Sequence, residues 1–244
     1  MDFTEDGFLG GRIVARQPIE GFRSGTDAVM LAAAVPAKAG DGLLELGCGV
    51  GVASLCLAAR VADCRISAVE IEPRLVVLAA ENVRANRFEE RVRVEDSDVL
   101  RLPRHLRRSF DHVFCNPPFH SNAGEVSPDV DRARALSDRD GLGNWIAAGL
   151  ARVAPGGTLT FILRADRLVD ALQDAPRHGL SIFPLWPRRG EPAKRAIMQI
   201  HRNSRAPLRF LAGLILHQGD GGYTQEADAI LRGGASLALA NLRL

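Results

Sequence analysis

Short apolar runs alternate with segments of helical periodicity through the middle of the chain. The runs have the length and β-branched content of buried strands, and apolar residues in the other segments recur with a helical spacing. The runs that read as strands are residues 43–46, 65–70, 91–95, 110–115 and 158–163. The segments that read as helices are residues 28–35, 52–61, 73–86, 141–153 and 166–175. This alternation predicts an α/β fold with a doubly wound, mainly parallel sheet.

The two ends of the chain have a different pattern. Residues 3–26 are rich in Gly and Arg and show no clear period, after which Thr26 or Asp27 can cap the first helix. Residues 180–185, 196–200 and 208–216 read as three strands, and residues 227–232 as a short helix. Adjacent late strands can form a hairpin, which would give the sheet an antiparallel edge. Residues 120–139 are polar and are predicted to form a loop over the site.

The composition indicates the class of protein but does not identify its binding partners. The chain is 46% hydrophobic and 25% charged, as in ordinary globular proteins, and its net charge of +2 does not by itself indicate a nucleic-acid partner. No uncharged run reaches membrane-spanning length, and the acidic start lacks the features of a signal peptide, so a cytoplasmic protein is expected. The 4 cysteines form no CxxC pair, which favours buried thiols over a zinc site.

A glycine-rich turn joins the first predicted strand to the next helix. Residues 45–51 read Glu-Leu-Gly-Cys-Gly-Val-Gly. A dinucleotide fingerprint needs Gly or Ala at a fixed later position. In the two possible frames that position holds Val52 or Ser54, so both frames fail. The remaining pattern predicts a turn that approaches a nucleoside without a pyrophosphate.

Two acids follow at the ends of the next strands. Glu70 ends the second strand, where a carboxylate can accept hydrogen bonds from both hydroxyls of a ribose. Asp98 follows the third strand, and it either accepts from an adenine amine or simply closes a turn. The carboxyl ends of parallel strands meet at one edge of a sheet, so both side chains are expected beside the glycine turn.

The fourth strand runs directly into Asn116-Pro117-Pro118-Phe119. Neither proline can donate to a strand ladder, and a proline restricts the residue before it to extended conformations. The strand therefore stops at Asn116 and fixes its amide at the same edge, next to a rigid turn and an aromatic ring.

Residues 45–51, Glu70, Asp98 and residues 116–119 together resemble the class I S-adenosylmethionine-dependent methyltransferases, which have a Rossmann-like sheet. The Asn-Pro-Pro-aromatic motif is typical of enzymes that methylate a planar nitrogen. Residues 8–12, 17–18 and 21–33 further resemble the opening of tRNA adenine-N6 methyltransferases, which act on the adenosine 3′ of the anticodon in a valine tRNA. The tail is similar to the same group at residues 216–218, 223–224 and 230–232. The resemblance implies one domain over residues 1–244, in which residues 1–40 cover the cofactor and residues 41–244 form the catalytic core.

The resemblance also implies roles for single residues. Asn116 and the Pro117 carbonyl would accept the hydrogens of the target amine, Phe119 would stack on the base, and Arg23 would meet the methionine carboxylate. The remaining cofactor contacts are expected from Glu45, Gly47, Cys48, Gly49, Glu70, Ile71, Asp98 and Asn116. No metal is required, because the cofactor carries the reactive methyl group.

A basic segment near the end of the chain is a candidate RNA surface. It contains Arg188, Arg189, Lys194, Arg195, Arg202, Arg205 and Arg209, opposed by Glu191. Arg189, Lys194 and Arg195 are the predicted phosphate contacts, although solvated strand faces would look the same. The competing hypotheses are a glutamine-N5 protein methyltransferase, a ribosomal RNA guanine-N2 methyltransferase, and a protein that binds the cofactor without catalysis. The short stretch before the glycine turn disfavours the first, and the intact motif at residues 116–119 disfavours the last.

Overall fold

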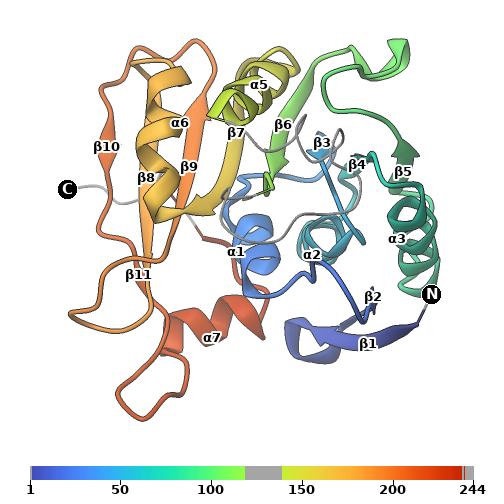
Figure 1. Cartoon of the computed structure of the whole chain (residues 1–244), viewed down its shortest axis with the longest axis horizontal. Helices are drawn as coiled ribbons and strands as arrows, with labels where there is room; N and C mark the ends of the chain where they lie inside the picture. The colour runs from blue at the N-terminus through green and yellow to red at the C-terminus, as the bar shows by residue number, and fades with distance from the viewer. Residues whose placement is uncertain (1, 119–138, 238, 240–244) are drawn as a thin grey trace.

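The computed structural model describes residues 2–118, 139–237 and 239, with the side chains of residues 139 and 140 left out. Within this part the main sheet has nine strands in the order β10-β8-β9-β7-β6-β3-β4-β5, and β11 also pairs with β8 (Figure 1). The strands are β3 (Gly42–Leu46), β4 (Arg65–Glu70), β5 (Val92–Asp96), β6 (Phe110–Cys115), β7 (Val153–Arg164), β8 (Leu180–Trp186), β9 (Arg195–His201), β10 (Arg209–Phe210) and β11 (Leu214–Ile215). All pairings are parallel except those of β9, which runs antiparallel to both β7 and β8. The predicted doubly wound, mainly parallel sheet is confirmed.

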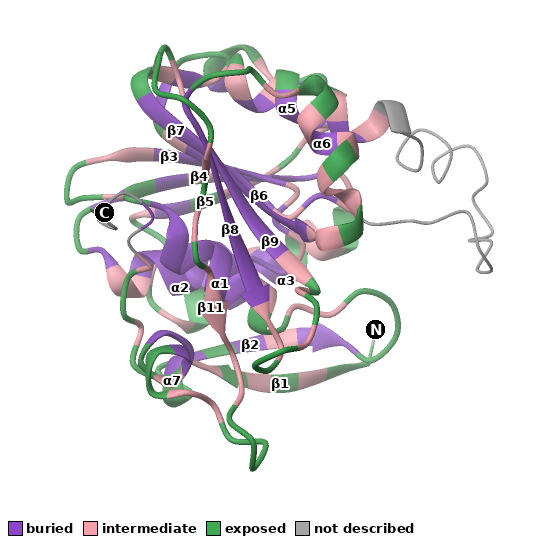
Figure 2. Cartoon of the chain, turned by 90° about the vertical axis from the view of Figure 1, so that its left-hand side faces the viewer, coloured by how far each residue is buried: buried purple, intermediate pink, exposed green. Residues whose placement is uncertain are grey.

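Helices cover both faces of this sheet (Figure 2). On one side lie α1 (Thr26–Ala34), α2 (Val52–Arg60), α3 (Pro73–Ala85) and α7 (Gln225–Leu231), and on the other α5 (Arg139–Leu150) and α6 (Leu168–Asp174). Strand β3 shows why its sequence is apolar without alternation. Leu43 packs into the core under α1 and α2, whereas Leu44 and Leu46 pack into the core under α5. A strand buried on both faces needs apolar residues at successive positions.

The N-terminal segment differs from the prediction. Residues 3–26 contain a two-stranded antiparallel hairpin of β1 (Phe3–Phe8) and β2 (Ile13–Pro18). The alternation of buried and exposed residues in β2 is not visible as a hydrophobic pattern, because the polar residue Gln17 lies on the buried side. Its side-chain amide donates to the carboxylate of Asp6 at 2.8 Å. Helix α1 is present, but neither predicted cap is used. Its N-cap is Gly25, and Asp27 instead forms an ion pair with Arg195 at 2.6 Å.

Two glycines allow close approach between strands in the second half of the chain. Residues 208–216 form two short strands in place of one, broken at Gly213, which has a φ of +84°. A Cβ there would lie 2.3 Å from the Pro184 carbonyl oxygen. Residues 155–157 lie inside β7, where Gly157 allows close approach of β6, because a Cβ would lie 2.2 Å from the Asp111 carbonyl oxygen. The predicted loop at residues 120–139 falls almost entirely outside the described residues.

Candidate active site

The predicted site residues gather at the carboxyl edge of the parallel strands. Leu46 at the end of β3 pairs with Cys115 at the end of β6, and with Val69 near the end of β4. Glu70 pairs in turn with Asp96, the last residue of β5. The glycine turn, Asn116, Glu70 and the Asp98 loop therefore leave the sheet side by side, as the strand order requires.

The glycine turn adopts left-handed backbone conformations at each of its glycines. Gly47, Gly49 and Gly51 have φ values of +66°, +56° and +85°. A Cβ on Gly47 would lie 2.6 Å from the indole ring of Trp145 in α5, so this glycine is needed for packing. A Cβ on Gly49 would meet nothing within 4 Å. The turn thus presents bare backbone to open space at Gly49, where a ligand can approach closely.

Glu70 holds the turn to the neighbouring strand. Its Oε2 accepts a hydrogen bond from the Gly49 amide at 2.8 Å, and its Oε1 accepts from the amides of Ile71 and Glu72 at 2.9 and 3.0 Å. The residue is 8% exposed. An ionised carboxylate offers about four acceptor positions, so capacity remains for a ligand hydroxyl after these three bonds. The carboxylate and the bare glycine backbone fit the ribose of S-adenosylmethionine.

Glu45 supports the turn from below. Its carboxylate is buried and accepts from the Ser54 amide at 3.1 Å and from the Ser54 hydroxyl, in the first turn of α2. The Ser54 amide belongs to a helix start, where no intrahelical acceptor exists. Burial raises the pKa of Glu45 from 4.5 to about 8, although both bonds from Ser54 favour the charged form. The described hydrogen bonds of the Glu45 carboxylate are thus both made to Ser54.

The Asn116 side chain has an unusual environment. The residue is half-buried, but its Oδ1 is fully buried and has no hydrogen-bond partner among the described residues. Buried carbonyl oxygens are nearly always paired, so this acceptor needs a donor from outside the described chain. Pro117 beside it is buried, and Phe119 lies outside the described residues. Burial also raises the pKa of Cys48 and Cys115 well above that of a free thiol, so neither is activated as a nucleophile.

Arg23 and Asp98 have partners within the protein. The Arg23 guanidinium donates to the Pro18 carbonyl at 2.9 Å, to Thr4 at 2.8 Å and to Asp6 at 2.6 Å. These bonds fasten it to the N-terminal hairpin. Asp98 accepts from the Leu100 amide at 2.8 Å, which is the geometry of a turn-closing aspartate. Neither arrangement uses every donor or acceptor of the side chain.

The basic segment spans two different edges of the sheet. Strand β8 is parallel to β7, since both are antiparallel to β9, so residues 187–194 connect β8 to β9 at the carboxyl edge. Arg189 and Lys194 in this loop are exposed, whereas Arg195 is paired with Asp27. Arg205 follows β9 and therefore lies toward the opposite edge.

Three further residues shape the site and were not predicted from the sequence, namely Ser54, Asn82 and Trp145. Ser54 donates its amide and its hydroxyl to Glu45, Asn82 donates to the Val50 carbonyl, and the Trp145 ring lies against Gly47. None belongs to a motif, so only the fold brings them together. In the described part of the chain, no three His, Cys, Asp or Glu side chains are arranged to hold a metal ion. No described helix is long and apolar enough to cross a membrane.

Comparison with known proteins finds methyltransferases by sequence and by structure. The methyltransferase small domain family model matches residues 23–136. A tRNA1(Val) (adenine(37)-N6)-methyltransferase from Actinobacillus pleuropneumoniae serotype 7 is 30% identical over 207 residues, which are 82% of this chain and 84% of the relative. The protein of the same name from Aeromonas hydrophila is 30% identical over 209 residues, with the same coverage. Among solved structures, a predicted O-methyltransferase from Agrobacterium tumefaciens has a TM-score of 0.73 and 25% identity, and the match covers 88% of this chain and 100% of that one.

The fold, the glycine turn and these matches define a class I S-adenosylmethionine-dependent methyltransferase. Within that class, the chain belongs to the family of the tRNA1(Val) (adenine(37)-N6)-methyltransferases.

We expect Glu70→Ala to weaken S-adenosylmethionine binding by roughly 1–3 kcal/mol, because a charged acceptor is removed and the Gly49 amide is released. Calorimetric titration measures this change, and Glu72→Ala is the control, since it alters the neighbouring acid. Equal affinity in the parent and Glu70→Ala would remove Glu70 from the cofactor site.

The raised pKa of Glu45 predicts a pH-dependent stability. Between about pH 4.5 and 8 the unfolded chain ionises this carboxyl while the folded protein keeps it protonated, so the free energy of unfolding falls as pH rises and levels off above about pH 8. Glu45→Gln removes the titration, so the parent should lose stability relative to this variant across that window. Chemical denaturation at several pH values tests the difference, and parallel curves would contradict it.

Proposed function

We propose that this enzyme transfers a methyl group to the N6 amine of an adenosine in tRNA, the nucleotide 3′ of the anticodon. The two relatives reported above carry this specificity in their names. The observation that carries the proposal within this chain is the buried Oδ1 of Asn116 at the carboxyl edge, which has no partner among the described residues. An exocyclic amine is a donor of the kind that this oxygen requires. Such a reaction on tRNA belongs to the cytoplasm.

The chemistry asks mainly for orientation. S-adenosylmethionine supplies an electrophilic methyl group on a sulfonium. The lone pair of an adenine amine is delocalised into the ring, so the nitrogen is a poor nucleophile. Acceptance of its hydrogens by Asn116 Oδ1 and the Pro117 carbonyl would rotate that lone pair out of conjugation. Proline fixes this geometry, because Pro117 restricts the backbone of Asn116 and cannot join the ladder.

No strong base is required for this step, since the amine proton becomes acidic only after the methyl group is attached. The acceleration then comes from holding the nitrogen and the methyl group in line. The raised pKa values of Cys48 and Cys115 agree with a mechanism without a thiolate. Phe119 is proposed to stack on the base, and a base in an anticodon loop is already partly exposed.

The cofactor contacts are proposed on the same geometry. Glu70 would accept from the ribose, Ile71 and Asp98 would lie along the adenine, and the backbone from Gly47 to Gly49 would face the methionine portion. Arg23 retains donors beyond its hairpin bonds that could reach the methionine carboxylate, and residues 1–40 would cover the bound cofactor.

Two exposed cations, Arg189 and Lys194, are proposed to contact tRNA phosphates at the carboxyl edge. Their loop is anchored beside the site, because the Ala165 amide at the end of β7 donates to the Lys194 carbonyl at 3.1 Å. Arg195 is better assigned to its ion pair with Asp27 than to RNA. Arg202 and Arg209 serve the fold, since Arg202 donates to the Val153 carbonyl and Arg209 donates to Ser181 at 3.0 Å.

We expect Asn116→Ala to lower the single-turnover rate by roughly 10²–10³-fold, as when a preorganised hydrogen-bonding group is removed from an active site. Cofactor affinity should change far less. Asn116→Asp keeps an acceptor but adds a charge that must be desolvated, so its rate should fall between the two. The measurement is methylation of an unmodified valine tRNA transcript, followed by nucleoside mass spectrometry.

The nature of the product separates the alternatives. N6-methyladenosine at the expected position supports the proposal. If the parent leaves tRNA unmodified but methylates a glutamine side chain or a guanine in ribosomal RNA, methyl transfer to a planar nitrogen stands and the substrate is wrong. If Asn116→Ala reacts as fast as the parent, the orienting role of the amide is wrong.

For the RNA surface, the double variant Arg189→Ala/Lys194→Ala should weaken tRNA binding and lower the salt slope by roughly 0.7–0.9 for each phosphate that is no longer neutralised. The control is Arg177→Ala/Arg205→Ala, which removes two exposed cations at the opposite edge, where the Gly179 amide donates to the Ala206 carbonyl at 2.8 Å. Filter binding at several salt concentrations would count against this surface if the two double variants behave alike.

A further inference from the structure

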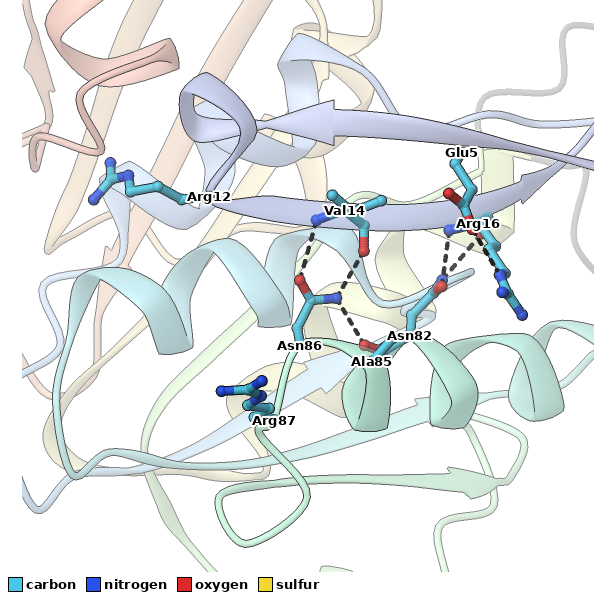
Figure 3. A pocket seen from close by; sticks show the side chains of 8 residues that line it. All are labelled: Glu5, Arg12, Val14, Arg16, Asn82, Ala85, Asn86 and Arg87. Atoms are coloured by element: carbon cyan, nitrogen blue, oxygen red, sulfur yellow. Dashed lines mark hydrogen bonds and ion pairs between the residues drawn. The ribbon is translucent and has the colours of Figure 1, made fainter.

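Two asparagines on one face of α3 bind the outer edge of β2 (Figure 3). The Asn82 amide accepts from the Arg16 backbone amide at 2.8 Å and donates to the Arg16 carbonyl at 3.0 Å. The Asn86 amide accepts from the Val14 amide at 3.1 Å and donates to the Val14 carbonyl at 2.7 Å. Each side chain therefore takes both backbone groups of one strand residue, as a neighbouring strand would do.

The match between helix and strand has a geometric basis. Residues four apart on a helix are separated by about 6 Å along its axis. Residues two apart on a strand are separated by about 6.7 Å. Asn82 and Asn86 on α3 therefore face Arg16 and Val14 on β2, and the edge of the N-terminal hairpin is closed without another strand.

Only one of the two asparagines also reaches the cofactor site. The Asn82 Nδ2 donates a second bond, to the Val50 carbonyl of the glycine turn, at 3.0 Å. Asn86 makes its additional bond to the Asn82 carbonyl, within α3 itself, at 2.8 Å. Asn82 is 1% exposed, and its three bonds use both donors of the amide and its oxygen. It is thus a buried junction between α3, the hairpin and the glycine turn.

The Val50 carbonyl depends on this junction. The amide that would donate to it in a regular helix belongs to Ser54, four residues later, and that amide is bound to Glu45 instead. A buried carbonyl without a partner is costly, so removal of the Asn82 donor leaves the turn free to rearrange. The next residue, Gly51, is the left-handed N-cap of α2.

The other end of the junction leads to the segment before α1. Beyond Arg16, the Gln17 side chain accepts from the Ser24 amide at 2.8 Å and donates to the Ser24 carbonyl at 3.1 Å. Between these residues the Arg23 guanidinium is tied to the Pro18 carbonyl. The position of β2 on α3 therefore sets the position of residues 18–24.

We propose that Asn82 is a positioning residue that couples the docking of the N-terminal hairpin to the conformation of the glycine turn, and so preorganises the turn for S-adenosylmethionine. The coupling concerns cofactor binding and is independent of which nitrogen is methylated. Asn86 supplies the same clamp to β2 without the coupling. A cavity of about 360 Å³ adjoins both asparagines and is lined by Arg12, Arg16, Arg87 and Glu5 among others (Figure 3). Two of its cations are held by structural partners, since Arg12 donates to the Gly233 carbonyl at 2.6 Å and Arg16 pairs with Glu5 at 3.1 Å.

The test compares Asn82→Ala with Asn86→Ala. Both remove a two-bond clamp on β2 from the same helix, so both should lower the midpoint of thermal unfolding. Only Asn82→Ala should weaken S-adenosylmethionine binding, by roughly tenfold for the removal of a buried bond that holds the turn. Calorimetric titration well below both unfolding transitions measures this. Equal affinities in the two variants would overturn the proposal. If both are normal, Asn82 acts only on stability, and if both are weakened, the effect comes from the lost clamp on β2 and not from the bond to Val50.

A second measurement does not require ligand. Hydrogen exchange of the peptide covering residues 46–55 should accelerate in Asn82→Ala and stay at the parental rate in Asn86→Ala. If Asn82→Ala does not fold, Asn82→Asp replaces it. It keeps an acceptor for the Arg16 amide and removes the nitrogen that donates to the Val50 carbonyl and to the Arg16 carbonyl. Unchanged exchange of this peptide in a folded Asn82 variant contradicts the coupling.

Discussion

Gly47, Gly49 and Gly51 have no side chains that could fix the conformation of the glycine turn, so the turn depends on other residues to hold it. Three side chains do so from three directions. Glu45 binds the first turn of α2 through Ser54, Glu70 binds the Gly49 amide, and Asn82 binds the Val50 carbonyl. Each satisfies a backbone group that has no partner within the turn. The side chains of Glu45, Glu70 and Asn82 approach the turn from within the protein, and a Cβ on Gly49 would meet nothing within 4 Å. The backbone at Gly49 therefore remains accessible to a ligand.

The positions of these supporting residues explain which parts of the site could be predicted from the sequence. Glu45, Glu70 and Asn116 lie at the ends of strands that are buried on both faces, and such strands are easily found from their apolar runs. Parallel pairing then brings their ends together, so the cluster follows from strand order alone. Asn82 lies within a helix, far from any strand end, and nothing in its surroundings distinguishes it from a solvated asparagine. Only the placement of the hairpin on α3 gives it a role.

The errors at the two ends have a related cause. The hairpin of β1 and β2 buries Gln17 and leaves Phe3 and Val14 exposed, so its alternation does not follow hydrophobicity. The division of residues 208–216 results from Gly213, whose conformation is required by the close approach of β8. In both cases tertiary contacts override the local sequence pattern. Gln17 is buried because hydrogen-bond partners are present there, and the strand is interrupted at Gly213 because β8 approaches closely. The short, regular α/β units between them carry no such conflict.

The antiparallel strand β9 has a consequence for how relatives of this enzyme can diverge. After β3, β4 and β7 the chain leaves the sheet toward a helix, so a change in loop length there shifts a packed element. Residues 187–194 instead connect β8 directly to β9, which pairs with it antiparallel, so they form a hairpin loop. Insertions are tolerated best in exposed loops of this kind. The length and charge of this one loop can therefore change without shifting the packed elements that hold the glycine turn and Asn116.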